Sequence, residues 1–221
     1  MITVHHLENS RSMRILWLLE ELGTEYEVKT YKRDPKTNLA PPDYQKLHPL
    51  GKAPIVTDGS KTLAETGAIV EHFLDKFPNS GLRPDAGTPQ RQSYYYWMHA
   101  SEGSLMNLLV LGLFMSRMET TPPFPINKIT SIVTGKIRDL YLTPSLTRMY
   151  EFMHDELGRT PWFAGETVTG ADIMMSYPVE AAHGRAGLDK TYPNVMAWLD
   201  RLHERPAYQR AVAKGGELET L

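Results

Sequence analysis

The hydrophobic pattern of the chain changes once along its length, and this change constrains the fold more than any other feature of the sequence. Residues 2–77 show the pattern of strand, helix, strand, helix, hairpin and helix, whereas only helical periodicity follows residue 88. The segment between them is rich in turn-forming residues and lacks periodicity. We therefore predict an α/β domain at residues 1–80, a linker at 81–87 and an all-α domain at 88–221.

Local signals mark the elements of the first domain. An apolar strand near the N-terminus precedes a helix that Ser10 or Ser12 is expected to cap and that ends at Gly23. A second strand is predicted at 26–31, and an Asp-Gly pair at 58–59 between two apolar runs predicts a hairpin. The apolar faces of the first helix and of a third helix from residue 65 are formed by Ile15, Leu18, Leu19 and Leu22, and by Val70, Phe73, Leu74 and Phe77.

The second domain is predicted to be a set of helices. A long helix runs from 88 to about 118, because nothing breaks it before the prolines at 122–125. The pair Thr143-Pro144 predicts the start of another helix, and Pro193 predicts the start of a later one. Residues 169–172 have the spacing of a capping box with aspartate in the place of glutamate, so we assign them to folding rather than to chemistry.

The composition excludes several classes of chemistry. The chain has no cysteine, so disulfides, thiolate metal sites and a cysteine nucleophile are excluded, and any thiol must come from a ligand. The eight histidines show no paired spacing typical of metal ligands, and no metal site is predicted. A net charge of -2 gives no attraction to nucleic acid or to an anionic membrane. No basic leader is found and no apolar run reaches the roughly 20 residues of a membrane span, so we expect a cytoplasmic protein.

Pro54 lies at the start of a strand, because an apolar run follows it directly. A trans proline at a strand edge is the simplest interpretation, since proline has no N–H to give to a ladder. However, the order strand, helix, strand, X-Pro hairpin and helix is that of a thioredoxin-like fold. In that fold a cis X-Pro bond turns the preceding residue outward, so Ala53 is expected to offer its N–H and C=O to an extended ligand.

Glu65 and Thr66 open the third helix, whose free N–H groups and positive dipole end favour an anion. In isolation such a pair would be expected only to cap its own helix. Because the pair directly follows the proline hairpin, it is expected to lie beside Ala53. We therefore predict that a ligand carboxylate binds at this helix start.

Two serines lie in the turn between the first strand and the first helix. Serines at a helix start are usually caps, but a hydroxyl here can also donate to a thiolate above the helix N-terminus. A free thiol has a pKa of about 8.5, and lowering it by about two units requires roughly 2.7 kcal/mol. One hydrogen bond to a charged group supplies about 1.5 to 3 kcal/mol and a helix dipole about 0.3 to 2 kcal/mol. This activation therefore requires neither a metal nor a histidine base.

Together these motifs resemble those of the cytosolic glutathione transferase family, and the resemblance covers nearly the whole chain. It rests on Ser10-Arg11-Ser12-Met13-Arg14, on His48-Pro49-Leu50-Gly51-Lys52-Ala53-Pro54, on Glu65-Thr66-Gly67-Ala68-Ile69, and on the segments at 163–165 and 169–173. The Asn-Ser-Arg-Ser turn and the prolines at 122–125 resemble the bacterial and fungal branch that uses serine or asparagine. The resemblance implies the glutathione transferase fold, with a thioredoxin-like N-terminal domain and an all-α C-terminal domain, and a homodimer.

Glutathione would be the co-substrate, and the resemblance implies where it binds. The tripeptide is expected along Ala53 and Pro54, with its γ-glutamyl carboxylate at Glu65 and Thr66. Lys52, which precedes these two residues of the hairpin, is expected to reach the glycyl end.

The residue that activates the sulfur is not fixed by the resemblance, because branches of the family use tyrosine, serine, cysteine or asparagine near this turn. Ser10, four residues before Arg14, matches the serine-using pattern best, and Asn9 and Ser12 are the alternatives. Cysteine-type members are excluded by the composition.

Two further predictions concern the long helix of the second domain. Glu102 is interpreted either as an acidic residue that reaches the amino group of glutathione across a dimer interface or as a solvated helix charge. The electrophile pocket is expected between the turn at 8–12 and the first C-terminal helices. Core packing is the alternative for each of its predicted lining residues, which are Met106, Val110, Phe114 and Met115.

The implied activity is attack by enzyme-bound glutathione thiolate on a small hydrophobic electrophile, as in detoxification. Reduction of a peroxide or a disulfide by the same thiolate is a close variant. The alternative is a glutathione-transferase-like binding or interaction module without catalysis. The combination of a hydroxyl turn, a proline hairpin and a Glu-Thr helix start argues against that alternative.

Overall fold

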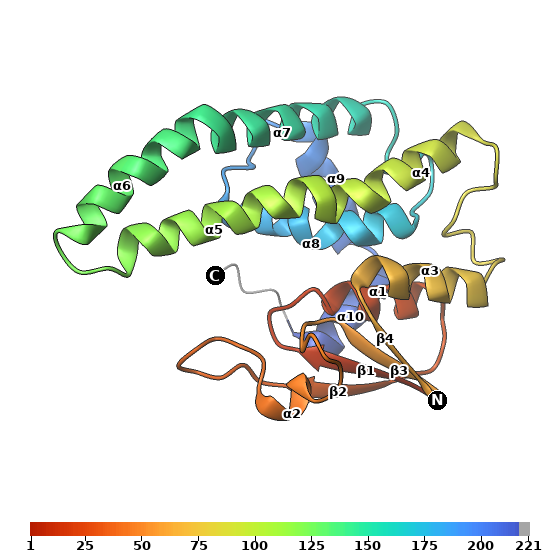
Figure 1. Cartoon of the computed structure of the whole chain (residues 1–221). Helices are drawn as coiled ribbons and strands as arrows, with labels where there is room; N and C mark the ends of the chain where they lie inside the picture. The colour runs from red at the N-terminus through yellow and green to blue at the C-terminus, as the bar shows by residue number, and fades with distance from the viewer. Residues whose placement is uncertain (217–221) are drawn as a thin grey trace.

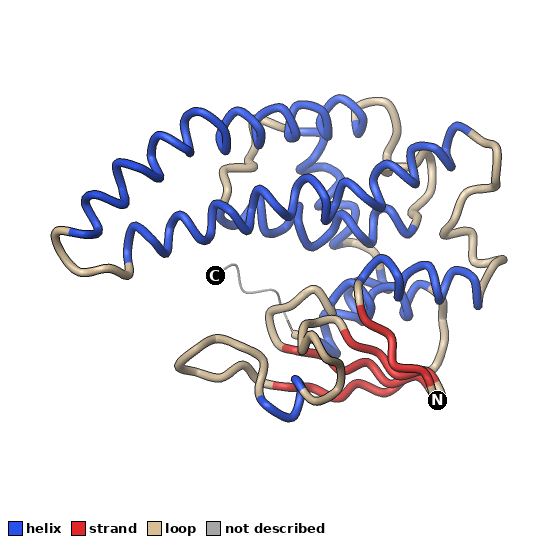
Figure 2. The backbone as a smooth tube through the Cα atoms, in the orientation of Figure 1, coloured by secondary structure: helices blue, strands red, loops and turns tan. Residues whose placement is uncertain are grey.

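A small mixed sheet organises the first part of the chain (Figures 1 and 2). The computed structural model describes residues 1–216. The strands lie in the order β2-β1-β3-β4, with β1 parallel to β2 and the other pairs antiparallel. The elements are β1 (Ile2–Leu7), α1 (Met13–Glu21), β2 (Glu27–Tyr31), α2 (Pro42–Gln45), β3 (Ile55–Asp58), β4 (Lys61–Ala64) and α3 (Thr66–Lys76). The predicted thioredoxin-like domain is confirmed.

Helices make up the rest of the described chain (Figure 1). They are α4 (Pro89–Ala100), η1 (Ser101–Met106), α5 (Asn107–Thr120), α6 (Ile126–Ile137), η2 (Arg138–Leu142), α7 (Thr143–Leu157), α8 (Gly170–Arg185), α9 (Pro193–His203) and α10 (Pro206–Gly215), where η marks a π-helical segment. The all-α prediction is confirmed. None of the helices within residues 1–216 is both long and apolar enough to cross a membrane.

The long helix predicted from residue 88 is confirmed, because α4, η1 and α5 follow one another without a break. Thr88 caps it, accepting a hydrogen bond from the backbone N–H of Arg91 at 3.2 Å. The predicted linker at 81–87 falls between the end of α3 and the start of α4. Within it Leu82 is buried, and its carbonyl oxygen accepts a hydrogen bond from the N–H of Gly170 at 2.8 Å. The exact domain boundaries stay a prediction.

The predicted helix at Thr143-Pro144 is confirmed as α7, which begins at Thr143, but Thr143 does not cap it. Helices α6, η2 and α7 run continuously, and Leu142 before α7 already has helical angles. The N–H of Thr143 donates to the carbonyl oxygen of Arg138, five residues back, as in a π-helical turn. Proline normally ends a helix because it lacks the N–H and its ring meets the preceding turn. The wider π turn directly before Pro144 accommodates it inside a helix.

The last helix returns to the first domain. Helix α10 lies against α1. Arg205, the residue before α10, donates two hydrogen bonds of 2.6 and 2.8 Å to the carboxylate of Glu21. Two cations within α10, Arg210 and Lys214, pair with the carboxylate of Glu20 at 2.7 and 2.5 Å. The C-terminal end of α10 is thereby fixed beside β1 and the start of α1, where the site lies.

The predicted capping box at 169–172 is confirmed. The fully buried Asp172 carboxylate accepts hydrogen bonds from the N–H and the hydroxyl of Thr169 at 2.9 and 3.0 Å. Its other oxygen accepts from the N–H of Phe163 at 2.9 Å and from the indole of Trp198 on α9 at 3.1 Å. One carboxylate therefore joins the start of α8 to the preceding loop and to α9, which is a folding role, as expected.

Candidate functional site

The two serines before α1 form a buried chain of hydroxyl groups. Ser10 Oγ lies 2.7 Å from Ser12 Oγ, which lies 2.8 Å from Nδ1 of His6 on β1. Ser10 is 4% exposed, Ser12 0% and His6 1%. The imidazole continues the chain, because its Nε2 lies 2.8 Å from the carbonyl oxygen of Gly215 at the end of α10.

The predicted serine cap of α1 is wrong in its detail. The helix begins where expected, with Ser12 as its N-cap residue, but the Ser12 side chain makes no hydrogen bond to the helix N–H groups. Ser10 Oγ accepts the N–H of Ser12 at 3.2 Å, which lies before the first helical residue. The reason is that the Ser12 hydroxyl is engaged with Ser10 and with His6. The capping interpretation therefore does not account for these serines.

The rest of the turn is held by one arginine. Arg33 donates to the backbone carbonyl oxygens of Glu8 and Asn9 at 2.9 and 3.0 Å. Asn9 itself has a positive φ of 51°, which is uncommon for a residue other than glycine and is tolerated best by asparagine. The arginine thus fixes the backbone that presents Asn9 and Ser10.

A pocket beside this turn brings together five of the predicted glutathione-binding residues. Lys52, Ala53, Pro54, Glu65 and Thr66 line it, together with Arg11, His48, Leu50 and Ala64. The Ala53–Pro54 peptide bond is cis, as predicted. The β3–β4 hairpin therefore places the proline loop against the start of α3.

The start of α3 has an unusual backbone. Glu65 has a positive φ of 70°, and its side chain does not cap the helix. Strained backbone of this kind is frequent at ligand-binding sites. In addition, the first N–H groups of α3 lie at the positive end of the helix dipole, which favours an anion. Thr66, at the first helical position, is 3% exposed and lines the pocket. The Glu65 side chain therefore does not cap α3, contrary to the simple capping interpretation of this pair.

Glu102 joins the two domains through a pair of arginines. It lies in the π-helical segment η1, and its two oxygens contact Arg11 at 3.0 Å and the fully buried Arg14. Burial lowers the pKa of Arg14, and the charge of Glu102 opposes this change. Arg14 also donates to the carbonyl oxygen of Met174 at 2.8 Å and to Thr66 Oγ1 at 3.3 Å.

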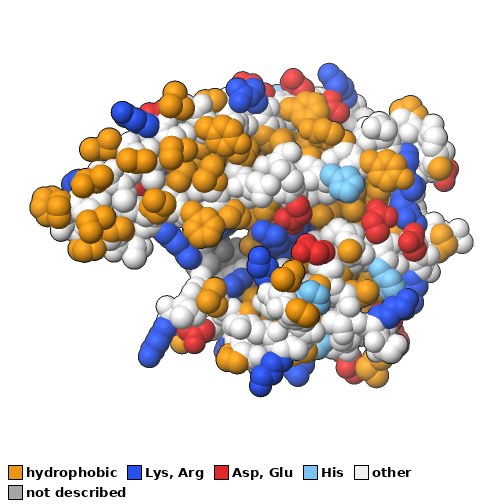
Figure 3. Space-filling model, in the orientation of Figure 1, with side chains coloured by type: hydrophobic (Ala, Val, Ile, Leu, Met, Phe, Trp, Pro, Cys, Tyr) orange, Lys and Arg blue, Asp and Glu red, His pale blue; other side chains and the backbone are white. Residues whose placement is uncertain are grey.

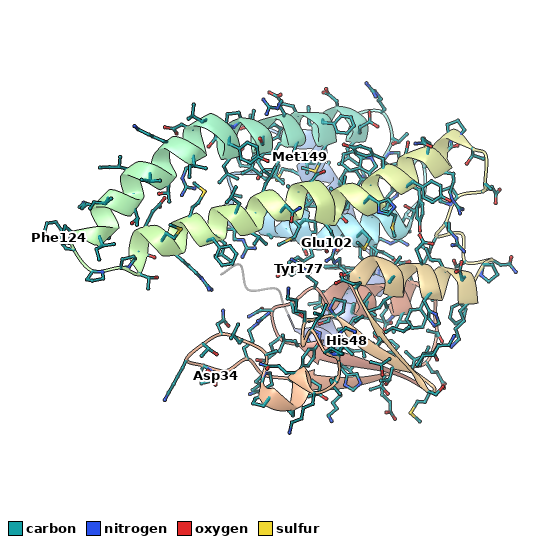
Figure 4. All side chains as sticks on the ribbon, viewed as in Figure 1. Asp34, His48, Glu102, Phe124, Met149 and Tyr177 are labelled. Carbon is teal, nitrogen blue, oxygen red and sulfur yellow. The ribbon has the colours of Figure 1, made fainter. Side chains whose placement is uncertain are left out.

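The position of Glu102 bears on both of its predicted interpretations. Figure 4 shows Glu102 and Tyr177 between the helices and the N-terminal domain, and in Figure 3 acidic and basic side chains meet at a hollow between the two parts. The Glu102 side chain is 31% exposed, and its two carboxylate oxygens pair with Arg11 and Arg14 of its own chain. Through Arg14 it lies one side chain away from Thr66.

The four predicted electrophile-pocket residues differ in burial. Met106 and Met115 are 4% and 3% exposed and belong to the hydrophobic core, so core packing, the alternative interpretation, describes them. The physical reason is their place on the face of the η1–α5 helix that packs against the rest of the helical domain. Val110 is half-buried and Phe114 is 59% exposed.

Sequence reasoning assigned no role to His6, Arg11 or Arg14. His6 and Gly215 are 209 positions apart in the chain, and no residue near His6 in the sequence indicates their contact. Arg14 did carry a signal, because it lies four residues before the buried Leu18 on one face of α1. A charge on an apolar helix face indicates a buried partner.

Comparisons with known proteins agree with this geometry. Residues 1–75 match the family description "Glutathione S-transferase, N-terminal domain", and residues 142–201 match "Glutathione S-transferase, C-terminal domain". The chain is 36% identical over 214 residues to glutathione S-transferase 3 of Schizosaccharomyces pombe, covering 97% of this chain and 88% of that protein. It is 31% identical to glutathione S-transferase 1 of Saccharomyces cerevisiae, covering 98% and 96% of the two chains.

A solved structure shows the same fold. The crystal structure of a glutathione S-transferase from Actinobacillus pleuropneumoniae has a TM-score of 0.76 and is 32% identical, covering 100% of this chain and 95% of that one. Both the sequence relatives and this structure extend over nearly the full length of the chain. The resemblance seen in the motifs is thereby confirmed, and the chain belongs to the glutathione S-transferase family.

Proposed function

We propose that this transferase binds glutathione in the pocket between the proline loop and α3, with its thiol at the start of α1. The γ-glutamyl carboxylate would accept hydrogen bonds at the N-terminus of α3 beside Thr66, and the ligand backbone would pair with Ala53. Lys52 would attract the glycyl carboxylate. Support comes from the shared pocket of these residues and from its position next to Arg11 of the serine turn.

The observation that carries this proposal is the chain of hydroxyls at the start of α1, which are not used as caps. Ser10 would donate to the thiolate, supplying about 1.5 to 3 kcal/mol, and the dipole of α1 would add about 0.3 to 2 kcal/mol. Their sum covers the roughly 2.7 kcal/mol needed to lower a thiol pKa by about two units. The thiolate then attacks an electrophilic carbon: a C–S bond forms and the leaving group departs with its electron pair.

The test compares retention on glutathione resin and turnover of an aryl halide for the parent and for Ser10→Ala. We expect binding to be retained and turnover to fall about 10- to 150-fold, the equivalent of one charged hydrogen bond. Equal turnover in Ser10→Ala would move the role to Asn9 or Ser12, to be checked with the matching alanine variants. Binding without turnover of any halide, peroxide or small disulfide would favour the non-catalytic module.

The electrophile subsite is proposed to include Val110 and Phe114 on α5. Phe114 is large and apolar but exposed, so its side chain is accessible to an apolar ligand. Phe114→Ala should raise KM for a hydrophobic electrophile and leave KM for glutathione unchanged. An equal effect on both constants would place Phe114 outside the electrophile subsite.

A homodimer is proposed on the resemblance and on exposed aromatic side chains. Tyr95 and Tyr96 on α4 and Phe152 on α7 are 45%, 46% and 38% exposed, and Tyr96 packs edge-to-face on Phe152 with ring centroids 5.5 Å apart. Aromatic residues are enriched in protein interfaces. Sedimentation equilibrium should give twice the mass of the chain, and a monomer at all concentrations would contradict the proposal.

A further inference from the structure

The hydrogen-bonded chain behind Ser10 has a defined direction. A carbonyl oxygen can only accept, so the Nε2 of His6 that contacts Gly215 carries a hydrogen. A neutral ring has one such hydrogen, which leaves Nδ1 as the acceptor for the Ser12 hydroxyl. The carbonyl oxygen of Leu7 is a longer alternative for that hydroxyl, at 3.4 Å. Ser12 Oγ then accepts the hydroxyl hydrogen of Ser10.

This direction suits a thiol that arrives protonated. Ser10 Oγ has two lone pairs, and one of them accepts the N–H of Ser12 at 3.2 Å. The second lone pair can accept the S–H hydrogen of a bound thiol. In the same arrangement Ser10 cannot donate to a thiolate, because its only hydrogen points to Ser12. If the thiol instead lost its proton to water, Ser10 could donate to the thiolate only by breaking its hydrogen bond to Ser12.

Two helix ends favour separated charges at the two ends of this chain. Gly215 is the last residue of α10, so His6 lies at the negative end of that helix dipole, which favours an imidazolium. Ser12 precedes α1, whose positive end favours a thiolate. Burial lowers the pKa of His6, whereas the Gly215 carbonyl and the nearby Glu8 carboxylate act to raise it. These two groups offset part of the effect of burial, which is the largest cause and leaves the pKa of His6 below its ordinary value.

We propose that His6 accepts the proton of the bound thiol through Ser10 and Ser12; this inference rests on the proposed role of Ser10. The S–H bond breaks with its electron pair staying on sulfur, and its hydrogen goes to Ser10 Oγ. The hydroxyl hydrogen of Ser10 goes to Ser12 Oγ, and that of Ser12 goes to Nδ1 of His6. Nothing is oxidised or reduced. Each hydrogen bond is kept with its direction reversed, so Ser10 ends as a donor to the thiolate.

Gly215 is the residue that lets α10 reach the imidazole. A Cβ at this position would lie 2.6 Å from Cδ1 of Leu16 and 3.2 Å from Cε1 of His6. The carbonyl that fixes the tautomer of His6 is therefore held at a close approach that a side chain would prevent. His6 acts through the serines and is a positioning residue for the thiol rather than a group that touches it.

The first test counts protons in the unaltered protein. Calorimetry in buffers of different ionisation enthalpy gives the protons released when glutathione binds, and S-methylglutathione serves as the matched ligand without a thiol proton. At a pH where ultraviolet absorbance shows bound thiolate, we expect both ligands to release the same number of protons. Release of one additional proton with glutathione would show that the thiol proton leaves to solvent, and would overturn the proposal.

The second test observes the imidazole directly. In protein labelled with nitrogen-15 histidine, Nδ1 of His6 should acquire the resonance of a protonated nitrogen with glutathione and not with S-methylglutathione. An Nδ1 that stays unprotonated while thiolate is present would overturn the proposal. The same change with both ligands would do so too, because the ring would then respond to occupancy alone.

A variant separates proton acceptance from positioning. His6→Asn keeps an acceptor near the Nδ1 position but cannot hold the proton, so the pKa of the bound thiol should rise by about one unit, a tenfold loss of thiolate. Affinity for S-methylglutathione should not change. His5→Asn is the matched control, because His5 lies on the same strand but bonds the hydroxyl of Tyr31 at 3.1 Å. An unchanged thiol pKa in His6→Asn would overturn the relay, whereas parental turnover in Ser10→Ala would instead contradict the proposed role of Ser10.

Discussion

Removal of the Asp172 carboxylate should destabilise the protein more than any other single change discussed for the helical domain. Its four hydrogen bonds come from three buried N–H groups and one hydroxyl. A buried donor left without a partner costs about 1 to 3 kcal/mol. Three such donors give about 3 to 9 kcal/mol, and we expect Asp172→Ala to lower the free energy of unfolding by about 5 kcal/mol.

The arrangement of the four bonds predicts a graded series. Oδ1 accepts from Phe163 and Trp198, whereas Oδ2 accepts twice from Thr169. In Asp172→Asn the amide oxygen can keep the first pair while the amide N–H₂ faces the N–H of Thr169, for an expected loss of about 2 kcal/mol. Thr169→Ala removes only a capping hydroxyl and should cost about 1 kcal/mol.

Urea unfolding followed by circular dichroism measures this series. Asp200→Asn is the matched control, because it removes the same charge from the exposed face of α9 and should change stability by less than about 0.5 kcal/mol. If Asp172→Ala costs no more than Thr169→Ala, the buried N–H groups find other partners and the reasoning is refuted.

Two further predictions concern α10. Burial acts to raise the pKa of Glu20, but hydrogen bonds from Lys214, Tyr26 and Arg210 outweigh it and lower the pKa from 4.5 to about 2. Because the pKa is lowered on folding, the ionised Glu20 stabilises the fold above about pH 4.5, and this stabilisation is lost as the pH falls toward 2. In urea unfolding, the parent should be more stable than Glu20→Gln by about 1 to 3 kcal/mol, and this difference should shrink between about pH 6 and pH 3. A constant difference would contradict this prediction. Gly215→Ala should destabilise by about 1 to 3 kcal/mol, because its Cβ would lie 2.6 Å from Leu16, whereas the control Gly135→Ala meets nothing within 4 Å and should be neutral or stabilising in thermal unfolding.

Features with a local cause could be predicted from the sequence. The end of α1 follows from Gly23, which has a positive φ of 61°, and the β3–β4 hairpin follows from its Asp-Gly turn. The start of α4 follows from Thr88, and the start of α8 from its capping box. The pocket residues were predicted for the same reason, because the proline loop, the hairpin and the start of α3 are consecutive in the chain.

Features that depend on distant partners could not be predicted. The pair Thr143-Pro144 does lie at the start of α7, but the π-helical segment that leads into it has no signal in the sequence. Ser12 has the pattern of a cap, but His6 competes for its hydroxyl. Glu102 lies 88 positions from Arg14, so its charge looked solvated in the sequence. For Ser12 and Glu102 a tertiary contact replaced the local preference.

The central claim is that the thiol of glutathione is held as an anion by Ser10 at the start of α1. A crystal structure with glutathione bound tests it most directly. We predict the sulfur within hydrogen-bonding distance of Ser10 Oγ and the γ-glutamyl carboxylate at the N-terminus of α3, beside Thr66. A sulfur turned away from residues 8–12, or glutathione bound elsewhere with this pocket empty, would contradict the account.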